Sequence, residues 1–219
     1  MQADTKRKIL EQGRAEFAYK CVKQVLDWKS FIFGTKPIDR GKIIKCWFYK
    51  KFEGKYGNNP IYRGFIENPE KKFYEFSNHL KRIGNKNKYT PEDKLKESIV
   101  ESYNAYKSEY KSFAKKIPML IRNNGIAATF AFVNARAKDG NAYELLYSHT
   151  DEWLKNCSII DLSCEDDLVK ELVSMKSTDY RAVTIEVLAF FNWLRRFAEG
   201  LIKGEDENEG EDEGDGIDE

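Results

Sequence analysis

Apolar side chains recur every three or four residues along most of the chain, which is the pattern of amphipathic helices. The clearest start is at Thr90, where a capping threonine precedes a proline and two acids. Helices are predicted over residues 5–28, 69–82, from Thr90 to Pro118, 119–124, 126–137, 142–155, 163–175 and 178–203. Pro118 is expected to end or kink its helix. The apolar, alanine-rich helix at 126–137 is expected to be deeply buried. The predicted fold is therefore all-α, a compact helical bundle.

Residues 29–103 differ in composition from the rest of the chain. They hold four of the five prolines and 14 of the 30 aromatic residues, and bases exceed acids by eight. Short strands are predicted around 43–49. The segment is interpreted as an inserted subdomain after the first helix, and its fold is left open. Its aromatic residues form either its own core or a stacking surface for single-stranded nucleic acid. We favour the core, because 75 residues need apolar mass to fold.

The charge of the chain is unevenly distributed. The net charge is +1, but residues 204–219 carry ten acids and no base, which leaves a body of +11. The chain thus divides into a helical domain (1–28 and 104–203), the insert (29–103) and an acidic tail (204–219) that is expected to be disordered. The near-neutral total does not exclude a polyanionic partner for the body.

Motifs of catalysis and metal binding are missing. The two histidines, His79 and His149, have no second His or Cys at helical metal-pair spacing, and neither a phosphate-binding glycine loop nor a nucleophile elbow is present. The longest apolar run, residues 126–133, is too short to span a bilayer. We expect a cytoplasmic protein that is not an enzyme and has no catalytic residue, metal, cofactor or membrane contact.

Basic residues supply the candidate binding site. Lys107, Lys111 and Lys115 form an i, i+4, i+8 ridge in which no lysine has an acid three or four residues away. Such a ridge suits a polyanion, whose bound counterions are released. Alternatively, acids from another helix neutralise it, and the sequence leaves both readings open. The full candidate set for binding a polyanion is Lys50, Lys51, Lys107, Lys111, Lys115, Lys116, Arg122, Arg181, Arg195 and Arg196, to which the resemblance described below adds Arg14.

Three stretches together carry a family resemblance. They are Arg14-Ala15-x-x-Ala18-x-x-x-Val22, the run from Tyr110 to Ile126 (YKSFAKKIPMLIRNNGI), and Asp179-Tyr180-Arg181-Ala182-Val183-Thr184-x-Glu186-x-Leu188 followed by Trp193-Leu194-Arg195-Arg196-Phe197-Ala198. In this order they resemble the small α-helical subunit of the type III-B CRISPR effector, the Cmr-type RNA-guided complex. The insert and the acidic tail fall outside the resemblance.

The resemblance implies a non-catalytic helical bundle whose copies stack along the complex, beside the backbone subunits that carry the guide RNA. Basic faces then line the groove in which target RNA pairs with the guide. The basic residues within the matching motifs are Arg14, Lys111, Lys115, Lys116, Arg122, Arg181, Arg195 and Arg196. The implied partners are guide RNA, target RNA, backbone subunits and further copies of the chain. The alternative is a protein–protein spacer without direct RNA contact.

Overall fold

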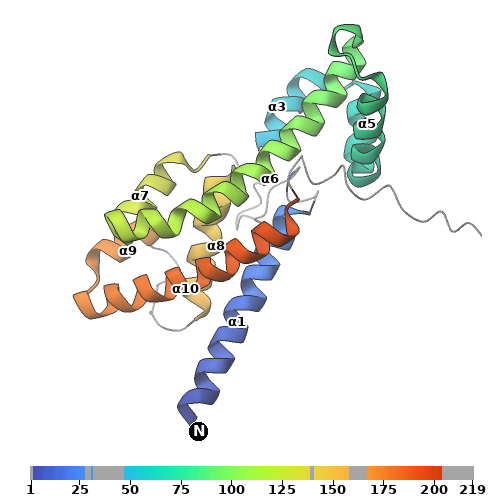
Figure 1. Ribbon diagram of the computed structural model, residues 1–219. Coiled ribbons are helices and arrows are strands. Elements are labelled where there is room, and N and C mark those ends of the chain that lie inside the picture. Colours follow the sequence, from blue (N-terminus) through green and yellow to red (C-terminus); the bar gives the residue numbers. More distant parts are fainter. Residues whose placement is uncertain (1, 28–30, 32–46, 139–140, 158–166, 204–219) are drawn as a thin grey trace, which may run out of the picture.

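The protein is all-α throughout the part that the structure describes (Figure 1). This computed structural model describes residues 2–27, 31, 47–138, 141–157 and 167–203, with side chains from Leu10 and from Lys51 onward in the first and third of these ranges. The acidic tail and part of the insert lie outside it. No helix within these ranges is long and apolar enough to cross a membrane. The predicted all-helical fold is confirmed for the described residues.

The bounds of the described helices are α1 Gln2–Val25, α3 Trp47–Tyr56, α4 Pro60–Glu67, α5 Pro69–Ile83, α6 Pro91–Asn124, α7 Ile126–Arg136, α8 Ala142–Asn156, α9 Leu168–Ser174 and α10 Ser177–Leu201. Outside α3 and α4, which the apolar pattern did not predict, the helices lie close to the predicted ranges, and the helices predicted at 90–118 and 119–124 are one. A short 3₁₀ turn, Lys86–Lys88, joins α5 to α6. Helix α9 begins after an N-cap at Asp167, whereas the start predicted at residue 163 lies outside the described residues.

Two local predictions are contradicted in part. Residues 47–49, expected near a strand, open helix α3, while residues 43–46 lie outside the described ones. Pro118 does not end its helix, because α6 runs from Pro91 to Asn124, and a kink at Pro118 remains a prediction. A proline inside a helix removes one backbone hydrogen bond and costs about 3 kcal/mol. Here Pro118 is buried between Ile117 and Ile121, two core residues, so tertiary packing offsets the cost.

Both ends of α6 are fixed by local chemistry. At the start, the Thr90 hydroxyl accepts a hydrogen bond from the Asp93 N–H, and the Asp93 carboxylate accepts one from the Thr90 N–H. This capping box satisfies two helix-end donors and confirms the predicted N-cap. At the other end, Gly125 has φ 81° and ψ 159°, a conformation that L side chains rarely adopt. The chain therefore turns sharply into α7.

Helix α6 contacts helices at both ends of the molecule (Figure 1). Its C-terminal half packs against α7, α8 and α10, and its N-terminal half packs against α5. Helix α1 lies along α10, and its N-terminal turns project beyond the bundle. The predicted boundary between insert and helical domain, at 103/104, falls inside α6. No break in secondary structure marks that division, which remains a prediction.

The buried aromatic residues of the insert form its core. Phe52, Tyr62, Phe65 and Phe76 are buried, with Phe52 stacked on Tyr62 and Phe65 on Phe76. Phe73 meets Tyr103 edge to face, with ring centroids 5.4 Å apart. This edge contact ties the insert core to α6. Burial of Phe52, Tyr62 and Phe65 agrees with the favoured interpretation, while the side chains of residues 47–49 lie outside the described ones.

Replacing Gly125 with alanine is expected to destabilise the fold. The new Cβ would lie 3.0 Å from the Tyr180 hydroxyl on a backbone that only glycine adopts readily. The expected loss is about 1–3 kcal/mol in the free energy of unfolding, measured by denaturant titration. Gly13→Ala is the control, because a Cβ there meets nothing within 4 Å and mid-helix alanine stabilises by about 0.5–1 kcal/mol. A Gly125→Ala variant as stable as Gly13→Ala would contradict the prediction.

Candidate nucleic-acid interface

Three basic residues of α6 share the face next to α10. Lys111, Lys115 and Arg122 lie within about 40° of one another around the helix. The Lys111 ammonium donates to the Ile202 carbonyl at 2.7 Å, and the Lys115 ammonium lies 3.2 Å from the Glu199 carboxylate. The middle of α6 therefore runs beside the C-terminal end of α10.

The opposite ends of the two helices also meet. The Ala127 N–H, just after α6, donates to the Tyr180 hydroxyl near the start of α10 at 3.3 Å. The two helices are thus antiparallel. We call the following exposed basic residues of α6 and α10 the seam surface: Lys115, Arg122, Arg181, Arg195 and Arg196.

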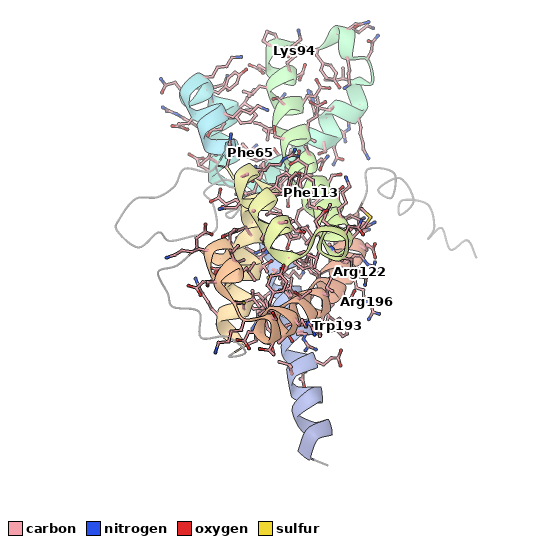
Figure 2. All side chains as sticks on the ribbon, turned by 90° about the vertical axis from the view of Figure 1, so that its left-hand side faces the viewer. Phe65, Lys94, Phe113, Arg122, Trp193 and Arg196 are labelled. Carbon is pink, nitrogen blue, oxygen red and sulfur yellow. The ribbon has the colours of Figure 1, made fainter. Side chains whose placement is uncertain are left out.

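Arginine dominates the seam surface. Arg122, Arg181 and Arg195 are exposed, and none of them has an ion pair with another described residue. Arg196 is also exposed, and its guanidinium lies 5.4 Å from the Trp193 ring centroid. Figure 2 shows Arg122 and Arg196, from α6 and α10, on the same side of the molecule. Guanidinium groups stay charged and bind phosphate with two parallel hydrogen bonds, so this surface suits a phosphate backbone.

The predicted lysine ridge on α6 is divided in the structure. Lys107 packs its ammonium over the Tyr103 and Phe73 rings, at 4.3 and 5.6 Å from the centroids. Lys111 is half-buried at the Ile202 carbonyl, and Lys115 has its acid partner from α10. The ridge is therefore partly neutralised by another helix, as the alternative interpretation of the sequence proposed. Lys115 remains part of the seam surface because it is 44% exposed.

Two other candidates, Lys50 and Lys51, lie on α3, at the insert end of the molecule (Figure 1). The Lys51 ammonium donates to the Ser102 hydroxyl at 3.3 Å and lies 5.3 Å from the Phe52 ring centroid. The Lys50 side chain is outside the described residues. The structure therefore does not bring these two lysines to the seam surface.

Arg14 is held by a buried carboxylate. Its guanidinium makes two hydrogen bonds to Glu186 of α10, at 2.6 and 2.7 Å, and the side chains are 13% and 5% exposed. Trp153 donates from Nε1 to the same carboxylate at 3.1 Å. The hydrogen bond with Glu186 is the main cause of the raised pKa of Arg14. This geometry joins α1 to α10 and leaves Arg14 little surface for RNA.

Sequence reasoning did not find the partner of Arg14. Glu186 is a single acid on the buried side of α10, between Val183 and Val187. An isolated acid within an apolar stripe indicates a buried partner, because a buried carboxylate requires a cation or hydrogen-bond donors. Arg14, four residues before the buried Ala18, is the matching base.

The two histidines have structural partners. His149 is buried between the Tyr110 hydroxyl at Nδ1 and the Gln24 side-chain oxygen at Nε2, both at 2.9 Å. Burial also raises the pKa of Tyr110 well above its ordinary value. His79 lies 2.7 Å from the Asp93 carboxylate. Among the described residues, no cluster of three His, Cys, Asp or Glu side chains could hold a metal ion.

Comparison with known proteins identifies the family. The family model for "CRISPR-associated protein (Cas_Cmr5)" matches residues 92–201, half of the chain, from the first turn of α6 to the end of α10. The CRISPR system Cmr subunit Cmr5 of Thermus thermophilus is 31% identical over 97 residues, which cover 44% of this chain and 78% of that protein. The chain therefore belongs to the Cmr5 family, and the resemblance to the small type III-B Cmr subunit is confirmed.

Removing Arg14 is expected to be strongly destabilising. Arg14→Ala leaves the Glu186 carboxylate buried with one neutral donor, Trp153, and breaking such a pair costs about 3–5 kcal/mol of unfolding free energy. Lys20→Ala, which breaks an exposed ion pair with Glu16, serves as control and should change stability by less than about 1 kcal/mol.

A double variant separates the charge effect from lost packing. Arg14→Met with Glu186→Gln removes both charges and keeps a side-chain oxygen that accepts from the Trp153 Nε1–H, so it should recover part of the stability lost in Arg14→Ala. Denaturant titration measures all three variants. A loss for Arg14→Ala no greater than that for Lys20→Ala would show that the pair does not hold α1 to α10.

Proposed function

We propose that this protein is a non-catalytic small subunit of a type III-B CRISPR effector that acts in the cytoplasm. Copies of it stack along the backbone subunits that carry the guide RNA, and the seam surface binds target RNA. Membership of the Cmr5 family supports the place in the complex. The residues proposed to contact RNA are those whose charge is exposed on the outer side of α6 and α10.

One observation carries the RNA assignment. Arg122, Arg181 and Arg195 are exposed on two packed helices, and no described carboxylate forms an ion pair with them. The fold therefore leaves the charge of these three arginines without a carboxylate partner among the described residues. A phosphate backbone supplies such a partner, and each neutralised phosphate releases condensed counterions. This chemistry recognises RNA irrespective of its sequence, as an RNA-guided complex requires of a subunit that does not read the target.

Binding by a single copy should be weak. Sequence-independent electrostatic binding has dissociation constants of roughly 10⁻⁴–10⁻⁶ M at physiological salt. Several copies on one backbone would bind the same strand with much higher total affinity, since each later contact is intramolecular. Moderate affinity per copy therefore fits the proposed role.

Reversing two arginines of the seam surface is expected to weaken RNA capture. In Arg122→Glu with Arg195→Glu, the slope of log affinity against log salt should fall by roughly 0.7 for each phosphate that the protein no longer neutralises. Fluorescence anisotropy with a labelled single-stranded RNA at several salt concentrations measures this for the isolated protein. Target capture by the assembled complex should fall in parallel.

The matched control changes net charge equally at the other end of the molecule. Lys88→Glu with Lys94→Glu alters two exposed lysines near the α5–α6 turn, and Figure 2 shows Lys94 far from Arg122. This control should keep most of the affinity. Equal losses in the two variants would mean that overall charge, not the seam surface, determines binding.

A protein–protein spacer without RNA contact is the second candidate function. It is favoured by the cations that already have internal partners, namely Lys111, Lys115 and Arg14. In that case the exposed arginines would contact acidic surfaces of neighbouring subunits. Ultraviolet crosslinking of RNA in the assembled complex separates the two functions, since a spacer would acquire no RNA adduct on α6 or α10.

A further inference from the structure

Three aromatic rings meet at the junction of α6, α7 and α8. Phe113 and Tyr143 are stacked, with centroids 4.0 Å apart and planes 30° apart. Phe132 meets Tyr143 edge to face, with centroids at 6.1 Å. We call these three residues the aromatic platform.

Two cations border the aromatic platform. The Arg136 guanidinium lies 4.3 Å from the Phe132 ring centroid and donates to the Tyr143 hydroxyl at 3.4 Å. The Lys116 ammonium lies 5.8 Å from the Phe113 centroid. Both cations are exposed, and within the described residues neither has a carboxylate partner. The platform thus combines rings with cations that the fold does not neutralise.

The fold does not require an aromatic ring at position 132. Helix α7 buries Ile126, Phe130 and Val133 in the core, whereas Phe132 faces outward and is 41% exposed. The sequence predicted deep burial for this whole helix, and that prediction is wrong for its outer side, where Ala128, Ala131, Phe132 and Ala135 are exposed. The exposed ring and its guanidinium neighbour therefore need another explanation than core packing.

We infer that the aromatic platform binds an unpaired base of single-stranded RNA. The base stacks on the exposed Phe132 ring, which accepts the face of any base. Lys116 and Arg136 then contact the phosphates on either side. The inference rests on the proposed function and extends it, because the seam surface contacts phosphates and the platform would contact bases.

The chemistry of the platform favours nucleic acid over an acidic protein surface. The rings lie beside cations that have no carboxylate partner among the described residues. A single strand offers bases to the rings and phosphates to the cations. A carboxylate-rich surface would satisfy the cations and leave the rings without a stacking partner. Lys115 of the seam surface and Lys116 of the platform are consecutive residues of α6, with side chains about 100° apart around the helix. A strand that contacts both therefore has to pass around α6.

The test removes the ring and keeps the charges. Phe132→Ala and Phe132→Leu, in the full-length protein, should weaken binding of a single-stranded RNA by between roughly five- and 150-fold, the usual effect of removing the stacking of one base. The salt slope should stay unchanged, because the protein still neutralises the same phosphates. An abasic strand of equal length should bind both variants and the unmodified protein alike. The leucine variant keeps apolar volume, so equal losses in the two variants indicate stacking.

Two controls accompany the ring variants. Val173→Ala removes another exposed apolar side chain, on α9, and should bind RNA like the unmodified protein. Arg136→Gln should weaken binding of both strands and lower the salt slope by roughly 0.7. Thermal melting of each variant confirms that the fold is kept.

The outcomes separate this inference from the proposed function. If the Phe132 variants bind RNA normally while Arg122→Glu with Arg195→Glu binds weakly, the platform inference is overturned and the proposed function stands. If the Phe132 variants lose association with other subunits but not with RNA, the platform is a protein contact and the inference fails. If the unmodified protein binds neither strand at low salt, the proposed function fails, and the inference with it.

Discussion

The structure depends on the continuous burial of one side of α6. Buried residues follow that side from Leu95 near its start to Ile121 near its end. A helix of 34 residues is about 51 Å long, so it reaches from the insert core to the bundle core. Neither core can shift along or around α6 without disturbing the other. The capping box at Thr90 and the turn at Gly125 fix the two ends of this helix.

Basic residues of similar appearance have different roles, and their surroundings decide which. Arg14 faces a carboxylate that is almost fully buried, so its charge stabilises the packing of two helices. Lys107 lies over rings, and Lys111 caps the chain end of α10 through a carbonyl. The arginines of the seam surface have no such partner in the described residues. Within the candidate set, the exposed arginines without an ion pair among the described residues lie on α6 and α10, whereas the described part of the insert carries further exposed cations such as Lys81 and Lys88.

Sequence reasoning predicted most helices because burial repeats with the helical period, and it failed where local rules met tertiary packing. Pro118 carries a strong local signal for a helix end, yet Pro118 itself is buried together with Ile117 and Ile121. The isolated acid Glu186 and its base Arg14 are 172 residues apart, so only the fold brings them together. Phe132 belongs to an apolar run, and periodicity within eight residues does not reveal which ring faces outward.

The predicted boundary of the insert at 103/104 lies inside the continuous helix α6, and this has a geometric consequence. The α5 end of the molecule and the seam surface are joined by a continuous helix and not by a linker. The number of helical residues between them therefore sets the angle between them around the helix axis. Adding or deleting one residue of α6 near Asn104 would turn one half against the other by about 100° and shift it by about 1.5 Å. Only changes of whole turns would restore the alignment. The number of residues in α6 near Asn104 is therefore as constrained as their identity.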